Sequence, residues 1–131
     1  MTRVVAAILC REGRILLGRR APGKTLAGCW EFPGGKIEPG ESPAVALRRE
    51  LKEELAIDID SVREWMTTRH VYDFGEIELV AVLARCLTGG DLQSTDHDRL
   101  DWVKPEDLLT YNLAPADRPI ANILRRRPSP Y

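Results

Sequence analysis

The feature that most constrains the fold is the stretch of residues 34–57, where a glycine-rich loop leads directly into a segment with the pattern of a helix. Ser42 is a favourable N-cap residue, and Pro43 suits the first helical position, where a backbone N–H has no partner in any case. Leucine then recurs every four residues, at Leu47, Leu51 and Leu55. This spacing predicts one amphipathic helix whose apolar stripe packs on a core.

The predicted helix also carries glutamates on a neighbouring face, because Glu50, Glu53 and Glu54 are spaced i, i+3 and i+4. Like charges so placed repel each other by about 0.2–0.5 kcal/mol per pair on an exposed helix. A divalent cation among them would remove this repulsion, and Mg²⁺ takes oxygen ligands of this kind. The alternative is a solvated face on which basic neighbours pair with the glutamates, as Arg49 can with Glu53. The helix alone leaves both interpretations open.

Taken together, the loop and the helix resemble the Nudix box, whose pattern is Gly, five residues, Glu, seven residues, Arg-Glu-apolar-any-Glu-Glu-any-Gly-apolar. The chain matches this pattern at Gly35, Glu41, Arg49, Glu50, Leu51, Glu53, Glu54 and Ile57. It departs from the pattern at the late glycine, where Ala56 stands. That glycine usually relieves backbone strain as the helix ends, so we expect Ala56 to cost about 1 kcal/mol if its φ is positive.

The resemblance implies the Nudix fold, an α/β/α sandwich with a mixed β-sheet, and a hydrolase that uses Mg²⁺ or Mn²⁺ to cleave a phosphoanhydride. It implies the following metal ligands: Gly34 through its carbonyl, Glu50, Glu53, Glu54 and Asp96. Glu50 or Glu53 would be the general base that deprotonates the attacking water, and Arg49 belongs to the same catalytic group. Glu41 and Arg49 would shape the loop and orient the ligating glutamates.

Residues expected to bind the substrate precede the helix. A similar Glu-Phe-Pro-Gly-Gly segment leads into the catalytic helix of Nudix nucleotide hydrolases, and here it ends at Gly35, where no side chain blocks a metal or a phosphate. Phe32 either lies in the core, which is the favoured interpretation, or lines a base pocket. Arg20 directly follows a predicted strand and either grips a phosphate through its planar guanidinium or lies in a solvated loop.

Two aspartates later in the chain complete the predicted site. In the resemblance, an acidic residue just before the strand with a Trp can join the metal shell; Asp96, six residues before Trp102, fits best, and Asp98 is the alternative. Asp117 lies in an Ala-Pro-Ala-Asp segment that resembles bacterial MutT-like enzymes, where this position can face the base. A carboxylate accepts hydrogen bonds, as from the amino group of cytosine or the N1–H and amino group of a guanine. The other role for Asp117 is N-cap of the last helix.

The remaining patterns predict strands and turns. We expect strands over residues 4–10, 14–19, 62–68, 77–87 and 100–103, a turn over residues 73–76, a polar loop over residues 88–100 and an amphipathic helix over residues 120–126. His70 is expected at the surface, without a functional role.

Composition excludes several other classes of protein. The 131 residues, 44% hydrophobic and 30% charged, are typical of one globular domain over residues 1–131. A formal net charge of −1 indicates no membrane and no stable nucleic-acid partner. Three widely spaced cysteines suit a reducing compartment, so we expect a cytoplasmic protein, a monomer or a homodimer, whose partner is a small-molecule nucleotide.

The leading hypothesis is a nucleoside triphosphate pyrophosphohydrolase that yields a nucleoside monophosphate and pyrophosphate from a cytosine nucleotide or an oxidised one such as 8-oxo-dGTP. A second hypothesis keeps the box but cleaves another nucleoside diphosphate derivative; such enzymes often carry extra segments, and this compact chain has no room for a large one. A third is a non-catalytic nucleotide-sensing module. That class would normally have lost a box carboxylate, and all of them are present here.

Overall fold

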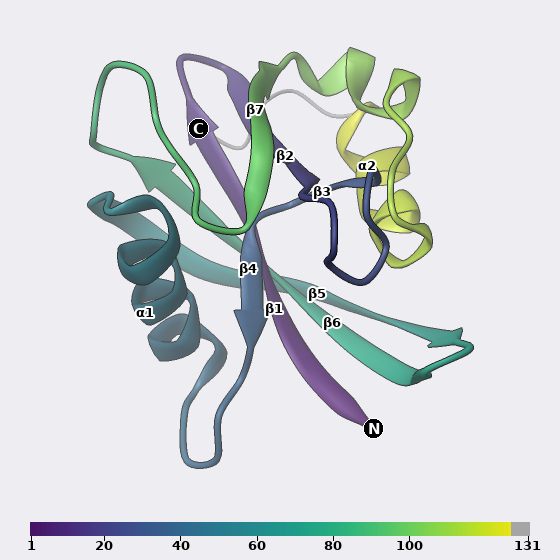
Figure 1. Ribbon diagram of the computed structural model, residues 1–131. Helices are drawn as coiled ribbons and strands as arrows, with labels where there is room; N and C mark the ends of the chain where they lie inside the picture. The colour runs from purple at the N-terminus through teal and green to yellow at the C-terminus, as the bar shows by residue number, and fades with distance from the viewer. Residues whose placement is uncertain (127–131) are drawn as a thin grey trace.

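The computed structural model describes residues 1–126 and shows a twisted mixed β-sheet with helices on both faces (Figure 1). The strands are β1 (Thr2–Arg11), β2 (Arg14–Arg20), β3 (Trp30–Glu31), β4 (Gly34–Lys36), β5 (Ile59–Tyr72), β6 (Gly75–Cys86) and β7 (His97–Val103). The helices are α1 (Pro43–Leu55) and α2 (Arg118–Leu124), with two 3-10 helices, η1 (Pro105–Thr110) and η2 (Pro115–Asp117). The predicted α/β architecture with a mixed sheet is confirmed.

Strand β1 is the centre of the sheet, whose order is β3-β2-β1-β6-β5. It runs parallel to β6, with Val5 opposite Val80, and antiparallel to β2. Strand β4 also pairs with β1, so that Gly35 lies opposite Val5, and β7 pairs with β2. This topology brings the glycine loop and the start of β7 next to α1, where Gly35 lies against Glu50 and His97 against Glu54.

Two hydrophobic clusters fill the space between the sheet and the helices. Alternate residues of β1 point to opposite faces, with Val5 and Leu9 toward α1 and Ile8 toward α2. The cluster under α1 includes Leu47 and Leu51, as the leucine spacing predicts. A strand buried on both faces therefore explains why residues 4–10 are apolar without interruption.

Helix α1 begins as predicted, and the residue that follows it, Ala56, has the positive φ on which the expected strain depends. The Ser42 hydroxyl accepts a hydrogen bond from the N–H of Val45 at 3.2 Å, and Pro43 occupies the first turn. Ala56 follows the helix in the left-handed conformation, with φ 53° and ψ 42°, and its N–H donates to the carbonyl of Lys52. The chain thus places an alanine where the Nudix box has a glycine, at a backbone conformation that disfavours an alanine.

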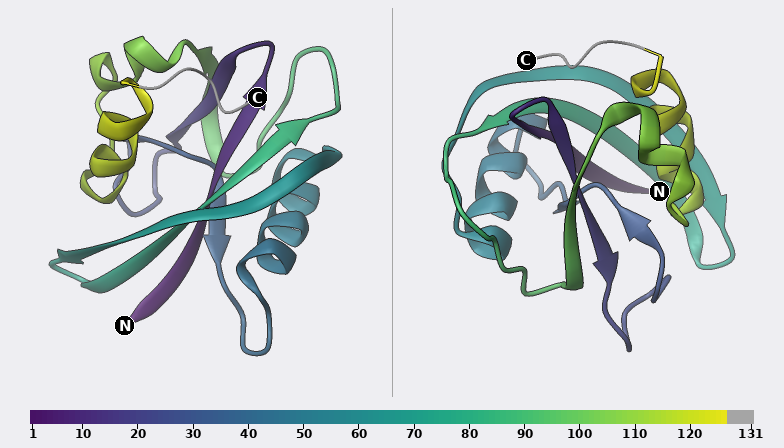
Figure 2. Two further views of the ribbon diagram at one scale, coloured as in Figure 1. Left: turned by 180° about the vertical axis from the view of Figure 1, so that it is seen from behind. Right: turned by 90° about the horizontal axis from the view of Figure 1, so that it is seen from above.

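Several element boundaries differ from the prediction. Strand β5 extends over Ile59–Tyr72 rather than residues 62–68. Irregularities in its register with β6 interrupt the alternation of buried and exposed residues, so the sequence pattern reveals only part of the strand. The β5–β6 hairpin projects beyond the rest of the sheet (Figure 2). Strand β7 begins at His97, inside the predicted loop, and α2 begins two residues earlier than expected. No helix within residues 1–126 is long and apolar enough to span a membrane.

Candidate active site

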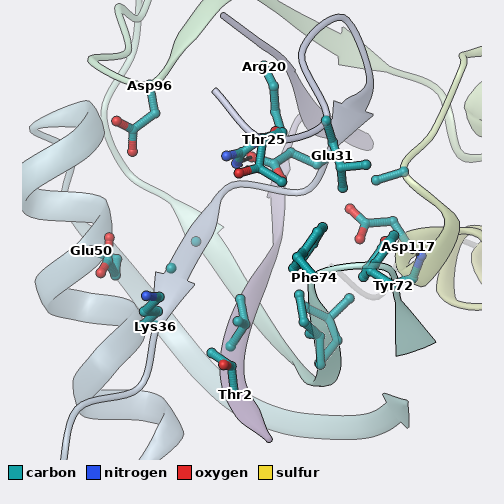
Figure 3. Close-up of a pocket in the computed structure, with 18 of the residues that line it drawn as sticks. Thr2, Arg20, Thr25, Glu31, Lys36, Glu50, Tyr72, Phe74, Asp96 and Asp117 are labelled. Atoms are coloured by element: carbon teal, nitrogen blue, oxygen red, sulfur yellow. Dashed lines mark hydrogen bonds and ion pairs between the residues drawn. The ribbon is translucent and has the colours of Figure 1, made fainter. Parts of the chain in front are cut away.

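A cleft of about 770 Å³ runs along the sheet from α1 to the tip of the β5–β6 hairpin (Figure 3). Glu50 and Glu53 of α1 line one end, together with Gly34 and Gly35. Other predicted residues line it as well, namely Arg20, Arg49, Asp96 and Asp117. The fold therefore brings most of the predicted site to one cavity, from segments that are far apart in the sequence.

Arg49 organises the carboxylate end of the cleft. Its Nε and Nη2 each donate to a carboxylate oxygen of Glu41 at 2.8 Å, and its Nη2 also donates to the carbonyl of Lys36 at 3.0 Å. The hydrogen bonds from Arg49, with one from the N–H of Glu38, lower the pKa of Glu41 to about 2. Arg49 and Glu41 therefore tie the glycine loop to α1, which supports the role that the resemblance implies for them.

The glutamates of α1 differ strongly in their surroundings. The Glu53 side chain is 64% exposed and lies 3.5 Å from Arg49, and Glu50 accepts a hydrogen bond from Arg49 at 3.0 Å. The Glu54 side chain is 2% exposed, and burial raises its pKa. Glu54 Oε2 is buried and has no hydrogen-bond partner within residues 1–126. An orphaned buried carboxylate oxygen calls for a cation or a donor that is absent from these residues.

The acidic side chains of the cleft do not lie close enough together to form a complete set of metal ligands. Within residues 1–126, no group of three or more His, Cys, Asp or Glu side chains is arranged to hold a metal ion. The physical reason is that Arg49 contacts Glu50 and Glu53, while Glu54 contacts His97. Pairing with basic neighbours, the alternative interpretation of the helix, thus holds in part.

The residues nevertheless fit a hard divalent cation in their chemistry and their access. All the candidate donors are oxygens, the ligands that Mg²⁺ prefers. A methyl group at Gly35 would lie 2.5 Å from both carboxylate oxygens of Glu50, so only glycine allows Glu50 to lie against the loop backbone. Gly34 faces β1 in the same way, since a Cβ there would meet the carbonyl oxygen of Val5 at 1.8 Å.

The two acidic candidates from the later loop have different partners. Asp96 lines the cleft and its carboxylate lies 3.4 Å from the ammonium group of Lys24. Asp98, the alternative, accepts hydrogen bonds from Arg19 at 2.8 and 3.2 Å. The Arg19 hydrogen bonds lower the pKa of Asp98 and commit its carboxylate to that pair. Asp96 therefore remains the better candidate for a ligand role.

Arg20 lies in β2 rather than in a solvated loop. Its Nη1 is 3.1 Å from Glu31 Oε2, and its Nε donates to the carbonyl of Thr25. The guanidinium lines the cleft between the carboxylate end and the hairpin end (Figure 3). A substrate phosphate would have to share it with Glu31.

Asp117 does not act as an N-cap, so that interpretation is wrong. Its backbone is already helical and its side chain makes no capping hydrogen bond. Instead its Oδ2 accepts a hydrogen bond from the N–H of Phe32 at 2.9 Å. Burial, followed by the nearby charge of Glu31, raises the pKa of Asp117 well above its usual value. A distant contact, absent from any local pattern, has replaced the capping role.

Phe32 lies in the core, as the favoured interpretation predicts, and the alternative of a base-pocket residue is wrong. Its side chain is 3% exposed and packs in the α2-side core, so it does not line the cleft as a substrate-binding residue. Phe32 contributes its backbone N–H to Asp117. The aromatic wall of the cleft comes instead from Tyr72 and Phe74, whose rings are stacked with centroids 4.9 Å apart. In the sequence, the signal for this wall was Phe74, an aromatic residue within the predicted turn of residues 73–76.

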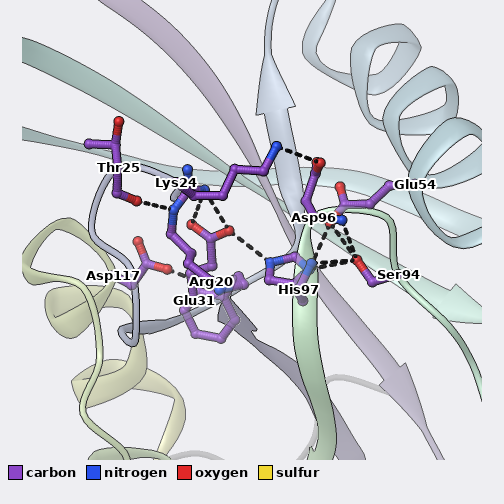
Figure 4. A network of polar contacts seen from close by, with 10 residues as sticks. Arg20, Lys24, Thr25, Glu31, Glu54, Ser94, Asp96, His97 and Asp117 are labelled. Atoms are coloured by element: carbon purple, nitrogen blue, oxygen red, sulfur yellow. Dashed lines mark hydrogen bonds and ion pairs between the residues drawn. The ribbon is translucent and has the colours of Figure 1, made fainter. Parts of the chain in front are cut away.

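Glu31 and His97 were missed as a pair. The His97 side chain is fully buried, with Nε2 at 2.8 Å from Glu31 Oε2 and Nδ1 at 3.0 Å from Glu54 Oε1 (Figure 4). Burial alone would lower its pKa, but the hydrogen bonds to both glutamates outweigh burial and raise the pKa of His97 to about 9. In the sequence His97 is one polar residue in a polar loop, and only the fold brings it to the glutamates.

Comparisons with known proteins agree with this site. Residues 1–124 match the family model of the NUDIX domain. The chain is 44% identical over 120 residues to the CTP pyrophosphohydrolase of Escherichia coli (strain K12), covering 92% of this chain and 88% of that protein. It is 33% identical over 115 residues to the putative 8-oxo-dGTP diphosphatase 2 of Mycobacterium tuberculosis (strain H37Rv), covering 88% and 82%. The solution structure of the E. coli ORF135 protein superposes with a TM-score of 0.75 at 42% identity, covering 93% of this chain and 86% of that one.

The fold and the site define a hydrolase with a carboxylate-bearing helix beside a mixed sheet. The chain belongs to the Nudix family, because the family model matches nearly its whole length. Hydrolases of this family generally use divalent metal cations. The predicted family and the predicted enzyme class are thereby confirmed.

Proposed function

We propose that this protein is a Mg²⁺-dependent nucleoside triphosphate pyrophosphohydrolase, which produces a nucleoside monophosphate and pyrophosphate. The observation that carries this proposal is the arrangement of the cleft, with box carboxylates at one end and stacked aromatic rings beside Asp117 at the other (Figure 3). A polyphosphate and a nucleobase need these two kinds of surface within one ligand's length. The 44% identity to a CTP pyrophosphohydrolase supports the same substrate class.

At the phosphate end, the following residues would hold the metal: Gly34 through its carbonyl, Glu50, Glu53, Glu54 and Asp96. Mg²⁺ bound there would supply charge neutralisation on the phosphate oxygens and a lowered pKa for the attacking water. Glu50 or Glu53 would accept a proton from the attacking water, and Glu53 is the more exposed of the two. Arg49 keeps both glutamates on the cleft side of α1 through its contacts at 3.0 and 3.5 Å.

At the base end, Asp117 selects the nucleobase. The Phe32 N–H holds Oδ2, which leaves Oδ1 for the substrate. Oδ1 can accept a hydrogen bond from a donor on the nucleobase. Cytosine offers such a donor at its amino group, and the 44% identical relative is a CTP pyrophosphohydrolase, so a cytosine nucleotide is the first candidate. An oxidised purine nucleotide such as 8-oxo-dGTP is the second, and a relative with that printed activity supports it.

The test is a panel of CTP, dCTP, dGTP, 8-oxo-dGTP and a nucleotide sugar, each incubated with Mg²⁺ or Mn²⁺, with pyrophosphate and orthophosphate measured separately. We expect pyrophosphate from a triphosphate, and its loss in Glu53→Gln. Tight nucleotide binding without turnover would instead identify a sensing module. Turnover of the nucleotide sugar alone would identify another nucleoside diphosphate derivative as the substrate.

A further inference from the structure

The fully buried His97 joins two elements that form opposite parts of the cleft. Its Nδ1 lies 3.0 Å from Glu54 on α1, and its Nε2 lies 2.8 Å from Glu31 on β3. Ser94 adds a third contact, with its hydroxyl at 2.8 Å from Nδ1 and at 3.4 Å from Glu54 Oε1. Both ring nitrogens are therefore used, and the ring has one orientation that satisfies them.

The two glutamates carry different parts of the site. Glu54 belongs to the box carboxylates, whereas Glu31 pairs with Arg20 at 3.1 Å on the side that faces the nucleotide. The contacts Arg20–Glu31–His97–Glu54 form a continuous polar chain, which leads from the cleft wall at Arg20 and Glu31 to the buried Glu54 (Figure 4). A shift of the ring would move the side chains on both sides at once.

The packing around the ring gives an independent observation. Gly18 of β2 has no positive φ that would require glycine, yet a Cβ at this position would lie 2.6 Å from two ring atoms of His97. A glycine in the interior of a strand weakens the strand and often marks the close approach of another group. The space that Gly18 leaves open is the space that the ring of His97 fills.

We propose that His97 is a positioning residue, which holds Glu54 and Glu31 so that the carboxylate end of the cleft and the Arg20–Glu31 pair keep fixed positions relative to each other. The inference rests on the proposed function and extends it to a residue that contacts neither phosphate nor base. Without the ring, Glu54 Oε1 would keep only the contact with Ser94, while Oε2 already has no partner within residues 1–126. Glu54 would then turn away from its present orientation.

The test uses two ways of disturbing the ring. His97→Gln keeps at most one of the two contacts with the glutamates, and Gly18→Ala keeps every polar group but pushes the ring aside. Gly89→Ala is the matched control, since Gly89 has no positive φ and a Cβ there meets nothing within 4 Å. Mn²⁺ binding without nucleotide, followed by electron paramagnetic resonance, is measured beside kcat and KM, and thermal unfolding gives the folded fraction.

We expect His97→Gln and Gly18→Ala each to weaken Mn²⁺ binding and to lower kcat by about tenfold or more per folded molecule, the usual effect of losing a group that orients a ligand. Combining Gly18→Ala with His97→Ala should do no further harm than His97→Ala alone, because the methyl group then occupies the vacated space. Gly89→Ala should match the parent.

Parent-like Mn²⁺ affinity and parent-like kcat per folded molecule in both variants, even at reduced stability, would overturn the proposal and leave His97 a purely structural residue. Absence of turnover in the parent would refute the proposed function alone. The Mn²⁺ affinities of the variants would still decide the role of His97, so the two failures are distinguishable.

Discussion

Ala56→Gly should be less destabilising than a glycine elsewhere, because it removes a measurable strain. Ala56 is exposed and holds φ at 53°, so its methyl group buries nothing and clashes with its own backbone. The left-handed conformation costs an L-residue about 1 kcal/mol, which a glycine at this position would recover. Glycine also increases the conformational entropy of the unfolded chain, which lowers the free energy of unfolding by about 0.4–1 kcal/mol.

Ala27→Gly isolates the second effect. Ala27 is exposed and lacks a positive φ, so glycine relieves nothing there and only loosens the unfolded chain. We expect Ala56→Gly to be more stable than Ala27→Gly by about 1 kcal/mol, a difference of about 4 °C in Tm for a domain of this size. Ala56→Gly itself should lie at or slightly above the parent.

Urea unfolding at constant m-value measures both variants. Equal destabilisation in the two variants would refute the strain argument, since the left-handed backbone would then carry no cost. Ala56→Gly should also keep the activity of the parent, because residue 56 does not line the cleft.

Three further predictions concern the cleft. Glu53→Gln should lower kcat by at least about a hundredfold with unchanged thermal unfolding, since an amide keeps the volume but neither binds a cation strongly nor accepts a proton; parent-like kcat would reject its role. Gly35→Ala should lower kcat while the protein stays folded by circular dichroism, because the methyl group would lie 2.4 Å from the carboxylate carbon of Glu50. Asp117→Asn should change the ranking of nucleotides more than the maximal rate, and an unchanged ranking would remove Asp117 as the base reader. Its burial raises the folded pKa above the unfolded value of about 3.8, so the parent loses stability as pH rises through that value, by up to about 1.4 kcal/mol per pH unit until the folded pKa is reached. Asp117→Asn should therefore gain stability relative to the parent between pH 4 and pH 7 in urea unfolding, and a constant difference across that range would contradict the raised pKa.

The parts of the fold that were predictable depend on short-range chemistry. The N-cap at Ser42 and the leucine spacing determine α1, and an unbroken apolar run determines β1. The length of β5 was not predictable, because its register with β6 shifts twice and hides the period of two.

The site was likewise predictable only where it depends on short-range sequence patterns. The spacing of the box places the glutamates on one helix, but their orientations depend on Arg49 and on His97, and the latter lies 43 residues from Glu54 along the chain. Asp117 shows the limit most clearly. A capping rule that considers only its neighbours misses the N–H of Phe32, which is 85 residues away in sequence and 2.9 Å away in space.

The most direct test of the proposed chemistry is to identify the products of one turnover of CTP by excess enzyme, with and without Mg²⁺, by anion-exchange chromatography. Glutamates of α1 that hold a cation against the polyphosphate predict CMP and pyrophosphate with Mg²⁺, and neither product without a divalent cation. Release of CDP and orthophosphate, or turnover that is unaffected by removing the cation, would contradict it.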